Sequence, residues 1–125
     1  MAKDLVYAML LDCYGDLLTD KQRDIMQLYY YEDLSLSEIA ENENITRQGV
    51  HDAIKHAEQY LDEFESKIGF MKKINKLRDI NIRIKQSAAA AEDYNKRYTY
   101  SKNISDFIRE IVDCTGQADE LFGQY

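Results

Sequence analysis

Apolar residues recur at helical spacing over the middle of the chain. From Val50 to Ile68 they are separated by 4, 3, 4, 3 and 4 residues, at Val50, Ile54, Ala57, Leu61, Phe64 and Ile68. This spacing is that of a heptad stripe, and it predicts one long helix that ends at Gly69. Two interpretations of the stripe stay open. It packs against the first helix and the C-terminal helices of the same chain, or it forms the seam of a coiled-coil dimer.

Polar residues before the stripe predict a second, shorter helix and a tight turn. Ser35, followed three residues later by Glu38, has the pattern of a capping box. Thr46 is placed to cap the long helix, and Asn44 tolerates the left-handed backbone that a sharp turn requires. Two capped helices joined by so short a turn predict a helix-turn-helix.

Two further helices are expected ahead of this motif. The first covers about residues 3–14 and ends in a left-handed cap at Gly15. Its inward face is predicted to contain Leu5, Val6, Met9, Leu10 and Cys13. Thr19 and Gln22 form another capping box, which opens a helix that fades near residues 32–33. The tyrosines at 29–31 predict core packing with one exposed ring, and base stacking is the alternative.

The C-terminal part has a different charge and aromatic content. Residues 71–86 predict a basic amphipathic helix. The segment contains six cations and a single acid, Asp79, and therefore has a charge of +5. Residues 94–103 are polar and aromatic, and we expect them to be the main loop. A last helix follows, with an apolar stripe at Ile104, Phe107, Ile108, Ile111, Thr115, Ala118 and Phe122.

The composition supports an all-α fold, because the chain has no proline and only five glycines in 125 residues. We expect a winged-helix-like, three-to-four-helix DNA-binding architecture over residues 1–69, with a long second helix in its helix-turn-helix. Residues 70–125 are expected to form a helical extension that packs on the first part. Apolar runs are short and the N-terminus is charged at once, which predicts a cytoplasmic protein without membrane insertion.

The negative charge is concentrated in the half that contains the helix-turn-helix. The whole chain has a net charge of −7. Residues 1–70 hold six Lys/Arg and fifteen Asp/Glu, which is −9, whereas residues 71–125 hold ten and eight, which is +2. Affinity for nucleic acid comes largely from neutralised phosphates, so this distribution argues against a simple DNA binder.

Residues with catalytic or metal-binding chemistry are few. There is no glycine-rich phosphate loop, no Ser/His/Asp or Cys/His set, and no cluster with metal-ligand spacing. His51 and His56 are five residues apart on one predicted helix, so their side chains do not meet at one site. Cys13 and Cys114 are expected to be reduced, buried thiols. The sequence therefore predicts a non-enzymatic protein without cofactor or metal.

Three segments carry a resemblance to known proteins, namely D-L-L-T-D-K-Q-R-D-I-M-Q-L-Y-Y (16–30), L-S-L-S-E-I-A-E-N (34–42) and I-T-R-Q-G-V-H-D-A-I-K (45–55). The chain resembles region 4 of bacterial sigma factors and, more closely, the YlxM family of small helix-turn-helix proteins. The resemblance extends from about Leu5 to Gly69. It implies a sigma-region-4-like fold and an accessory or regulatory role in the signal recognition particle pathway. His51 and His56 stand where tyrosine and arginine are expected.

Two hypotheses follow for function. In the first, an accessory protein contacts the RNA or the GTPase of the signal recognition particle, and cations of the basic helix meet RNA phosphates. Those cations are Lys72, Lys73, Lys76, Arg78, Arg83 and Lys85.

In the second hypothesis, a transcription regulator places the long helix in the DNA major groove. Its candidate contacts are Thr46, Arg47, Gln48, His51 and Lys55. Arg47 would pair with guanine and Gln48 with adenine. A protein-interaction scaffold and a homodimer, through the Val50–Ile68 stripe or the C-terminal helices, are further possibilities.

Overall fold

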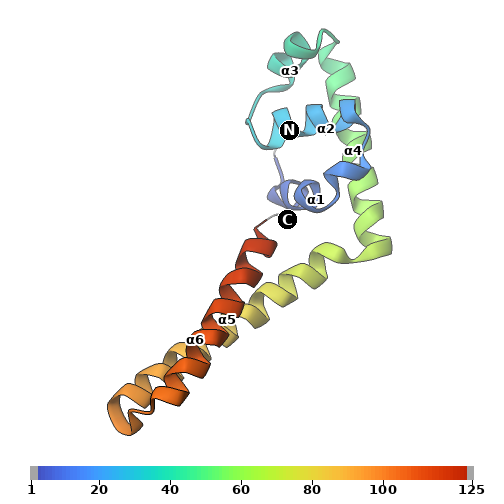
Figure 1. The fold of residues 1–125 in the computed structure, drawn as a ribbon. Coiled ribbons are helices and arrows are strands. Elements are labelled where there is room, and N and C mark those ends of the chain that lie inside the picture. Colours follow the sequence, from blue (N-terminus) through green and yellow to red (C-terminus); the bar gives the residue numbers. More distant parts are fainter. Residues whose placement is uncertain (1–2, 124–125) are drawn as a thin grey trace. The chain divides into compact units, whose positions relative to one another are not determined.

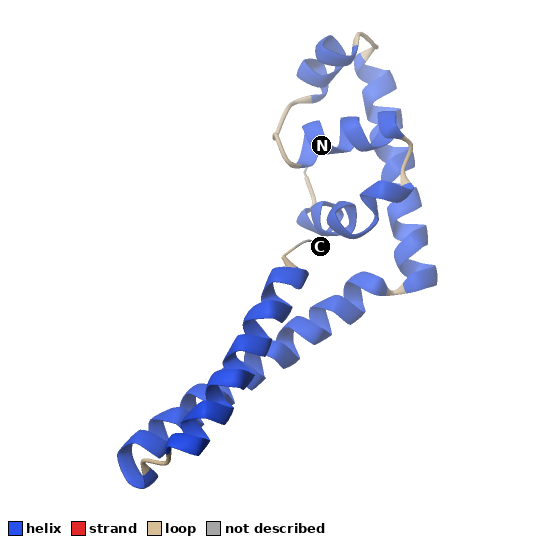
Figure 2. Cartoon of the chain, in the orientation of Figure 1, coloured by secondary structure: helices blue, strands red, loops and turns tan. Residues whose placement is uncertain are grey.

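The computed structural model describes residues 3–123, and this part of the chain consists of helices joined by short connections (Figure 1, Figure 2). The α-helices are α1 (Leu5–Tyr14), α2 (Asp20–Tyr30), α3 (Leu36–Glu43), α4 (Arg47–Ile68), α5 (Phe70–Tyr94) and α6 (Lys102–Phe122). The all-α prediction is confirmed. The described residues contain no strand, so the helix-turn-helix carries no β wing there. No helix among them is long and apolar enough to cross a bilayer.

The chain divides into two compact units, which we call the N-terminal unit (Met1–Met71) and the C-terminal unit (Lys72–Tyr125). The N-terminal unit contains α1 to α4, and α4 contacts each of the other three helices. The C-terminal unit contains most of α5 and all of α6. Each unit has its own internal packing, and this packing determines which side chains of the unit stay exposed.

Side-chain caps begin the helices of the helix-turn-helix as expected. Ser35 and Glu38 make both bonds of a capping box on α3, and Thr19 and Gln22 do the same on α2. The Thr46 hydroxyl accepts a hydrogen bond from the Gly49 amide at 2.9 Å at the start of α4. These bonds satisfy amides that a helix leaves without partners in its first turn, so the sequence itself fixes where each helix begins.

The turn of the helix-turn-helix depends on one residue in the left-handed region. Asn44 has φ 56° and ψ 44°, and the amide of the next residue, Ile45, donates to the Ala40 carbonyl at 3.0 Å. Asparagine tolerates this conformation better than most residues with a Cβ atom.

Asn44→Ala is expected to lower the free energy of unfolding by about 1–2 kcal/mol, the usual cost of a left-handed residue. Asn44→Gly, which removes that cost, should leave stability unchanged or slightly higher. Urea unfolding followed by circular dichroism measures both. Equal stability of the alanine and glycine variants would contradict the role of the backbone conformation at this position.

The core of the N-terminal unit is built around α4. Fourteen buried apolar side chains form one cluster, to which α1, α2 and α3 all contribute. Val50, Ile54, Ala57 and Leu61 of α4 are each 0% exposed. The heptad stripe is therefore covered by helices of its own unit over these four positions. The alternative of a dimer seam through the stripe is wrong there, because these side chains have no free surface; Ile68, at its end, is exposed.

The inward face of α1 differs from the prediction. Leu10 is buried, but Leu5, Val6 and Met9 are exposed. The buried positions that the prediction missed are Leu11 and Tyr14. The segment is apolar at almost every position, so spacing alone does not determine which face turns inward.

The end of α1 also differs from the prediction. Gly15 has φ −53° and continues into a short 3-10 turn, Gly15–Leu17, instead of adopting a left-handed cap. Next to it, Leu18 is buried in the core while Leu17 is exposed. At the end of α4, by contrast, Gly69 has φ 66° and ends the helix as expected.

The C-terminal unit is a hairpin of two antiparallel helices, α5 and α6. Its buried apolar side chains among the described residues are Ile74, Ala88 and Ile108. Buried polar groups are interspersed with them. The Asn81 amide donates to the Thr115 carbonyl at 3.2 Å and to the Asp119 carboxylate at 2.8 Å. Because a buried amide must find its partners, Asn81 fixes the register of α5 against α6.

The connection between α5 and α6 is shorter and more regular than predicted. Residues 94–103 were expected to be a loop, yet α5 continues to Tyr94 and a single π-helical turn, Asn95–Thr99, follows it. Asn95 is 3% exposed, and its side chain bonds to the backbone amide and carbonyl of Ser101. This one asparagine closes the turn, a local effect that polar composition does not reveal.

Candidate nucleic-acid interface

The candidate residues of the helix-turn-helix lie together at the start of α4. Thr46, Arg47, Gln48 and Lys55 are exposed, and His51 is half-buried. On a helix, positions 47, 48, 51 and 55 share one side, next to the side on which the buried Val50 and Ile54 lie. The structure therefore brings the predicted set to one surface, which we call the α4 face (Thr46, Arg47, Gln48, His51 and Lys55).

Several of these side chains already have partners within the chain. Gln48 donates to the Asp52 carboxylate at 3.0 Å, and the His51 ring lies 3.4 Å from the same oxygen. Lys55 lies 3.6 Å from the carboxylate of Glu58. Arg47 has no ion pair or side-chain hydrogen bond to any described residue. Its guanidinium is thus the group on the α4 face that is most available to a ligand.

Gly49 has a structural role that the sequence analysis did not assign. A Cβ atom at this position would lie 3.0 Å from the Thr46 hydroxyl oxygen. A side chain there would disturb the cap of α4, because the hydroxyl accepts from the Gly49 amide itself. The glycine keeps the first turn of α4 regular, and the adjacent Arg47 and Gln48 depend on that turn for their direction.

Acidic residues are frequent in the two helices of the helix-turn-helix. Helix α3 carries Glu38, Glu41 and Glu43, and α4 carries Asp52 next to His51. These carboxylates produce a negative potential, which repels phosphates over about a Debye length, ~8–10 Å in physiological salt. A nucleic acid that reaches the α4 face must gain its affinity from direct contacts.

The six cations of the basic helix do not share one surface. Arg78 donates to the Phe122 carbonyl at 2.7 Å and to Asn75 at 3.1 Å, and Lys85 is bonded to Asp119. The bond to Lys85 lowers the pKa of the Asp119 carboxyl. Both cations therefore hold α5 to α6. The other four are exposed and define what we call the basic face, namely Lys72, Lys73, Lys76 and Arg83.

Tyrosine hydroxyls tie α4 to the rest of the N-terminal unit. Tyr30 donates to Glu58 at 2.7 Å, and Tyr14 donates to Glu65 at 2.6 Å. Glu58 is only 7% exposed, so this bond partners a buried carboxylate. Burial and the bond to Glu58 both raise the pKa of Tyr30. These contacts hold α4 in place and thereby position the α4 face.

A third bond of this kind lies nearer the surface. The Tyr7 hydroxyl donates to Asp62 at 2.8 Å. This hydrogen bond raises the pKa of Tyr7 to about 12. Tyr31 is the exposed ring of the 29–31 triplet, and its hydroxyl bonds to Asp12. The prediction of core packing with one exposed ring is borne out, since Tyr29 is buried and Tyr30 packs against the core.

Exposed tyrosines at the end of the hairpin were not singled out by the sequence analysis. Tyr94, Tyr98 and Tyr100 are 63%, 72% and 85% exposed, and the first two rings lie 4.9 Å apart. The cations beside them are engaged with acids one turn away, Lys96 with Glu92 and Arg97 with Asp93. The alternation of aromatic and basic residues over 94–102 is the sequence pattern that could have indicated these exposed tyrosines.

The described residues hold no group of three or more His, Cys, Asp or Glu side chains that could bind a metal ion. Cys13 is half-buried and Cys114 is exposed, which corrects the expectation that both are buried. His51 and His56 lie on the same helix, and only His51 belongs to the α4 face.

Comparison with known proteins agrees with this architecture. Residues 1–103 match the model of family UPF0122, described as "Putative helix-turn-helix protein, YlxM / p13 like". A UPF0122 protein of Thermoanaerobacter sp. (strain X514) is 40% identical over 107 residues, which cover 86% of this chain and 92% of the relative.

Other similar proteins bear the same family name. A UPF0122 protein of Clostridium perfringens (strain 13 / Type A) is 42% identical over 106 residues, or 85% of this chain and 89% of the relative. One from Desulforamulus reducens is 54% identical over 67 residues, or 54% of this chain and 57% of the relative.

Proposed function

Because the chain belongs to the UPF0122 family of YlxM- and p13-like helix-turn-helix proteins, we propose that it is a non-enzymatic regulator that binds duplex DNA. The observation that carries this proposal is the α4 face, where a capped helix begins with exposed Arg47 and Gln48. The N-terminal turn of a second helix in this motif is the part that enters the major groove.

Arg47 and Gln48 have the chemistry for base contacts. A guanidinium bonds to two acceptors of guanine, and a carboxamide bonds to a donor and an acceptor of adenine. Gln48 must exchange its bond to Asp52 for the base, whereas Arg47 has no such bond to break. We therefore expect Arg47 to contribute more discrimination than Gln48.

The acidic surroundings of the α4 face set the expected strength of binding. Residues 1–70 carry a charge of −9, so the attraction to phosphates that most DNA-binding proteins use is weak. Binding should then depend on sequence, and random duplex DNA should compete poorly at physiological salt. At low salt, weak retention of random duplex is still expected.

Selection of bound duplexes from a random pool, followed by fluorescence anisotropy, tests this proposal. Arg47→Ala is expected to weaken binding to the selected duplex by about 1–3 kcal/mol, the contribution of one bidentate base contact. Lys67→Ala is the matched control, because Lys67 is an exposed cation at the other end of α4, paired with Glu63. Equal loss in both variants, or no selected duplex and no retention at low salt, would refute DNA binding.

A second candidate function is supported by the basic face of α5. Four exposed cations there, Lys72, Lys73, Lys76 and Arg83, suit the phosphates of helical RNA, which proteins bind largely through shape and backbone. In this reading the protein is an accessory of the signal recognition particle that contacts its RNA, its GTPase, or both.

The two candidates respond to different variants. Reversal of Lys72, Lys73 and Lys76 to glutamate should strongly weaken RNA binding and reduce the salt dependence of what remains, while the selected duplex remains bound through the α4 face. RNA binding that survives this reversal with an unchanged salt slope would exclude the basic face. A pulldown from lysate with and without nuclease then separates protein partners from nucleic-acid partners.

A further inference from the structure

The C-terminal hairpin leaves many large apolar side chains exposed. Its buried apolar core among the described residues is limited to Ile74, Ala88 and Ile108. Two helices alone cannot cover both sides of each other's apolar stripes, so large side chains remain on the outside. They are 40–66% exposed and comprise Leu77, Ile80, Ile82, Ile84, Ile104, Phe107, Ile111, Val112 and Leu121.

Most of these side chains lie on one side of the hairpin. On α5 the exposed positions Leu77, Ile80 and Ile84 follow 3- and 4-residue steps, and on α6 Ile104, Phe107 and Ile111 do the same. Two adjoining grooves between α5 and α6 share Ile84 and Ile111. We call the continuous surface the apolar face, lined by Ile80, Ile84, Phe107, Ile111 and Cys114.

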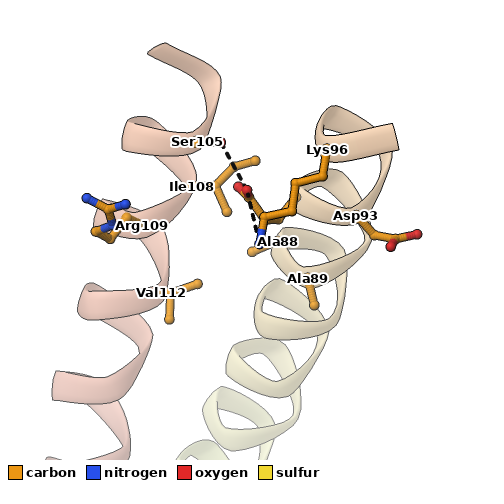
Figure 3. Close-up of a pocket in the computed structure, with 9 residues that line it drawn as sticks. Ala88, Ala89, Asp93, Lys96, Ser105, Ile108, Arg109 and Val112 are labelled. Atoms are coloured by element: carbon orange, nitrogen blue, oxygen red, sulfur yellow. Dashed lines mark hydrogen bonds and ion pairs between the residues drawn. The ribbon is translucent and has the colours of Figure 1, made fainter. Parts of the chain in front are cut away.

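The other side of the hairpin is different. The groove there is lined largely by small or charged residues, among them Ala89, Asp93, Lys96 and Arg109, with Val112 at its edge (Figure 3). The hydrogen bond between Ser105 and Glu92, 2.9 Å long, crosses it. Only one side of the hairpin is therefore suited to apolar packing.

We propose that the apolar face binds the apolar face of a second copy of this chain, forming a four-helix bundle in which α5 of each copy lies against α6 of the other. Two seams at 3- and 4-residue spacing, side by side on one face, are what a helical hairpin contributes to such a bundle. A two-fold contact uses the same face twice, so no second complementary surface is needed.

Charge selects the pairing of helices. Residues 71–86 of α5 carry +5, whereas α6 holds five acids and two cations and carries −3. Packing α5 on α5 would oppose like charges, and packing α5 on α6 of the second copy opposes unlike ones. Arg83 and Glu110 border the apolar face on its two sides, and neither has an ion pair among the described residues. In the proposed pairing each Arg83 lies near Glu110 of the second copy.

The side of the hairpin that contains the apolar face is large enough for this partner. A helix of 21 residues, the length of α6, is ~30 Å long, and two helices side by side are ~20 Å wide. One whole side of the hairpin therefore measures about 600 Å², the same order as the ~800 Å² that each partner buries in a stable interface.

Sedimentation of the full chain over a range of concentrations tests the proposal. A concentration-dependent dimer is expected, and Ile111→Glu should raise its dissociation constant by about tenfold or more, because it places a charge in the apolar contact. Val112→Glu is the matched control, since Val112 is the next residue and similarly exposed but faces the other groove. It should leave the dimer intact. Helicity by circular dichroism confirms that both variants fold.

A charge exchange tests the pairing of helices. Arg83→Glu and Glu110→Arg should each weaken the dimer, and the double variant should restore it, because both pairs are then reversed together. Cys114 gives an independent readout: its alkylation, followed by peptide mass spectrometry, should slow as protein concentration rises.

Three results would overturn the proposal. One is a chain that stays monomeric at all concentrations, whatever the rate at which Cys114 is alkylated. Another is a dimer that Val112→Glu disrupts as much as Ile111→Glu does. The third is a double charge variant that is weaker than both single variants, which would place like helices together.

Discussion

Replacing Ile54 with alanine is expected to lower the free energy of unfolding of the N-terminal unit by about 2–5 kcal/mol. Ile54 is 0% exposed and lies on the seam of α4 that α1, α2 and α3 cover. The loss combines the transfer of the removed methyl groups to water with the cavity they leave. Urea unfolding of the full chain, followed by far-ultraviolet circular dichroism, measures the change.

Ile68→Ala is the control for this substitution. It makes the same chemical change on the same seam of the same helix, but Ile68 is 48% exposed. The expected loss is within about 0.5 kcal/mol, as for most surface substitutions. A large effect at both positions would mean that α4 is buried along its whole length, contrary to the structure.

Tyr30→Phe is expected to destabilise the N-terminal unit by about 1–3 kcal/mol, the cost of leaving a buried polar group without a donor. The substitution removes the 2.7 Å hydrogen bond from Tyr30 to Glu58. Among the described residues, the buried carboxylate of Glu58 then keeps only its ion pair with Lys55, at 3.6 Å. Thermal or urea unfolding at neutral pH measures the loss.

The control for this bond is Tyr7→Phe, in which the deprived carboxylate belongs to the exposed Asp62. Water replaces the lost donor there, so the expected cost is well below that at Tyr30. Combining Tyr30→Phe with Glu58→Met should recover part of the stability, because both polar partners are then gone. A double variant as unstable as the sum of the single ones would contradict the bond between the two side chains.

The helix starts and stops could be predicted from the sequence because they are local. Thr19, Ser35 and Thr46 each bond to the amide three residues away, and Asn44 and Gly69 act through their own backbone angles. Spacing also identified the seam of α4, since five consecutive apolar steps of 3 and 4 residues occur in few other arrangements. For the same reason the α4 face was predicted as a set.

Features that depend on tertiary contacts were not predicted. The bond between Tyr30 and Glu58 joins residues 28 positions apart, and no spacing rule links a tyrosine on one helix to an acid on another. The sequence also does not separate Arg78 and Lys85, which bond to α6, from the other four cations of α5. That separation requires the position of α6, so the basic face is smaller than the sequence indicates.

The tyrosine–carboxylate bonds give the protein an intrinsic optical signal. The chain has ten tyrosines and no tryptophan, so its ultraviolet fluorescence comes from tyrosine alone. Carboxylates that accept a hydrogen bond from the phenol quench this emission, and Tyr7, Tyr14, Tyr30 and Tyr31 are all so bonded in the N-terminal unit. Unfolding of that unit therefore raises the tyrosine fluorescence intensity, and the stability of the unit can be measured without any added dye.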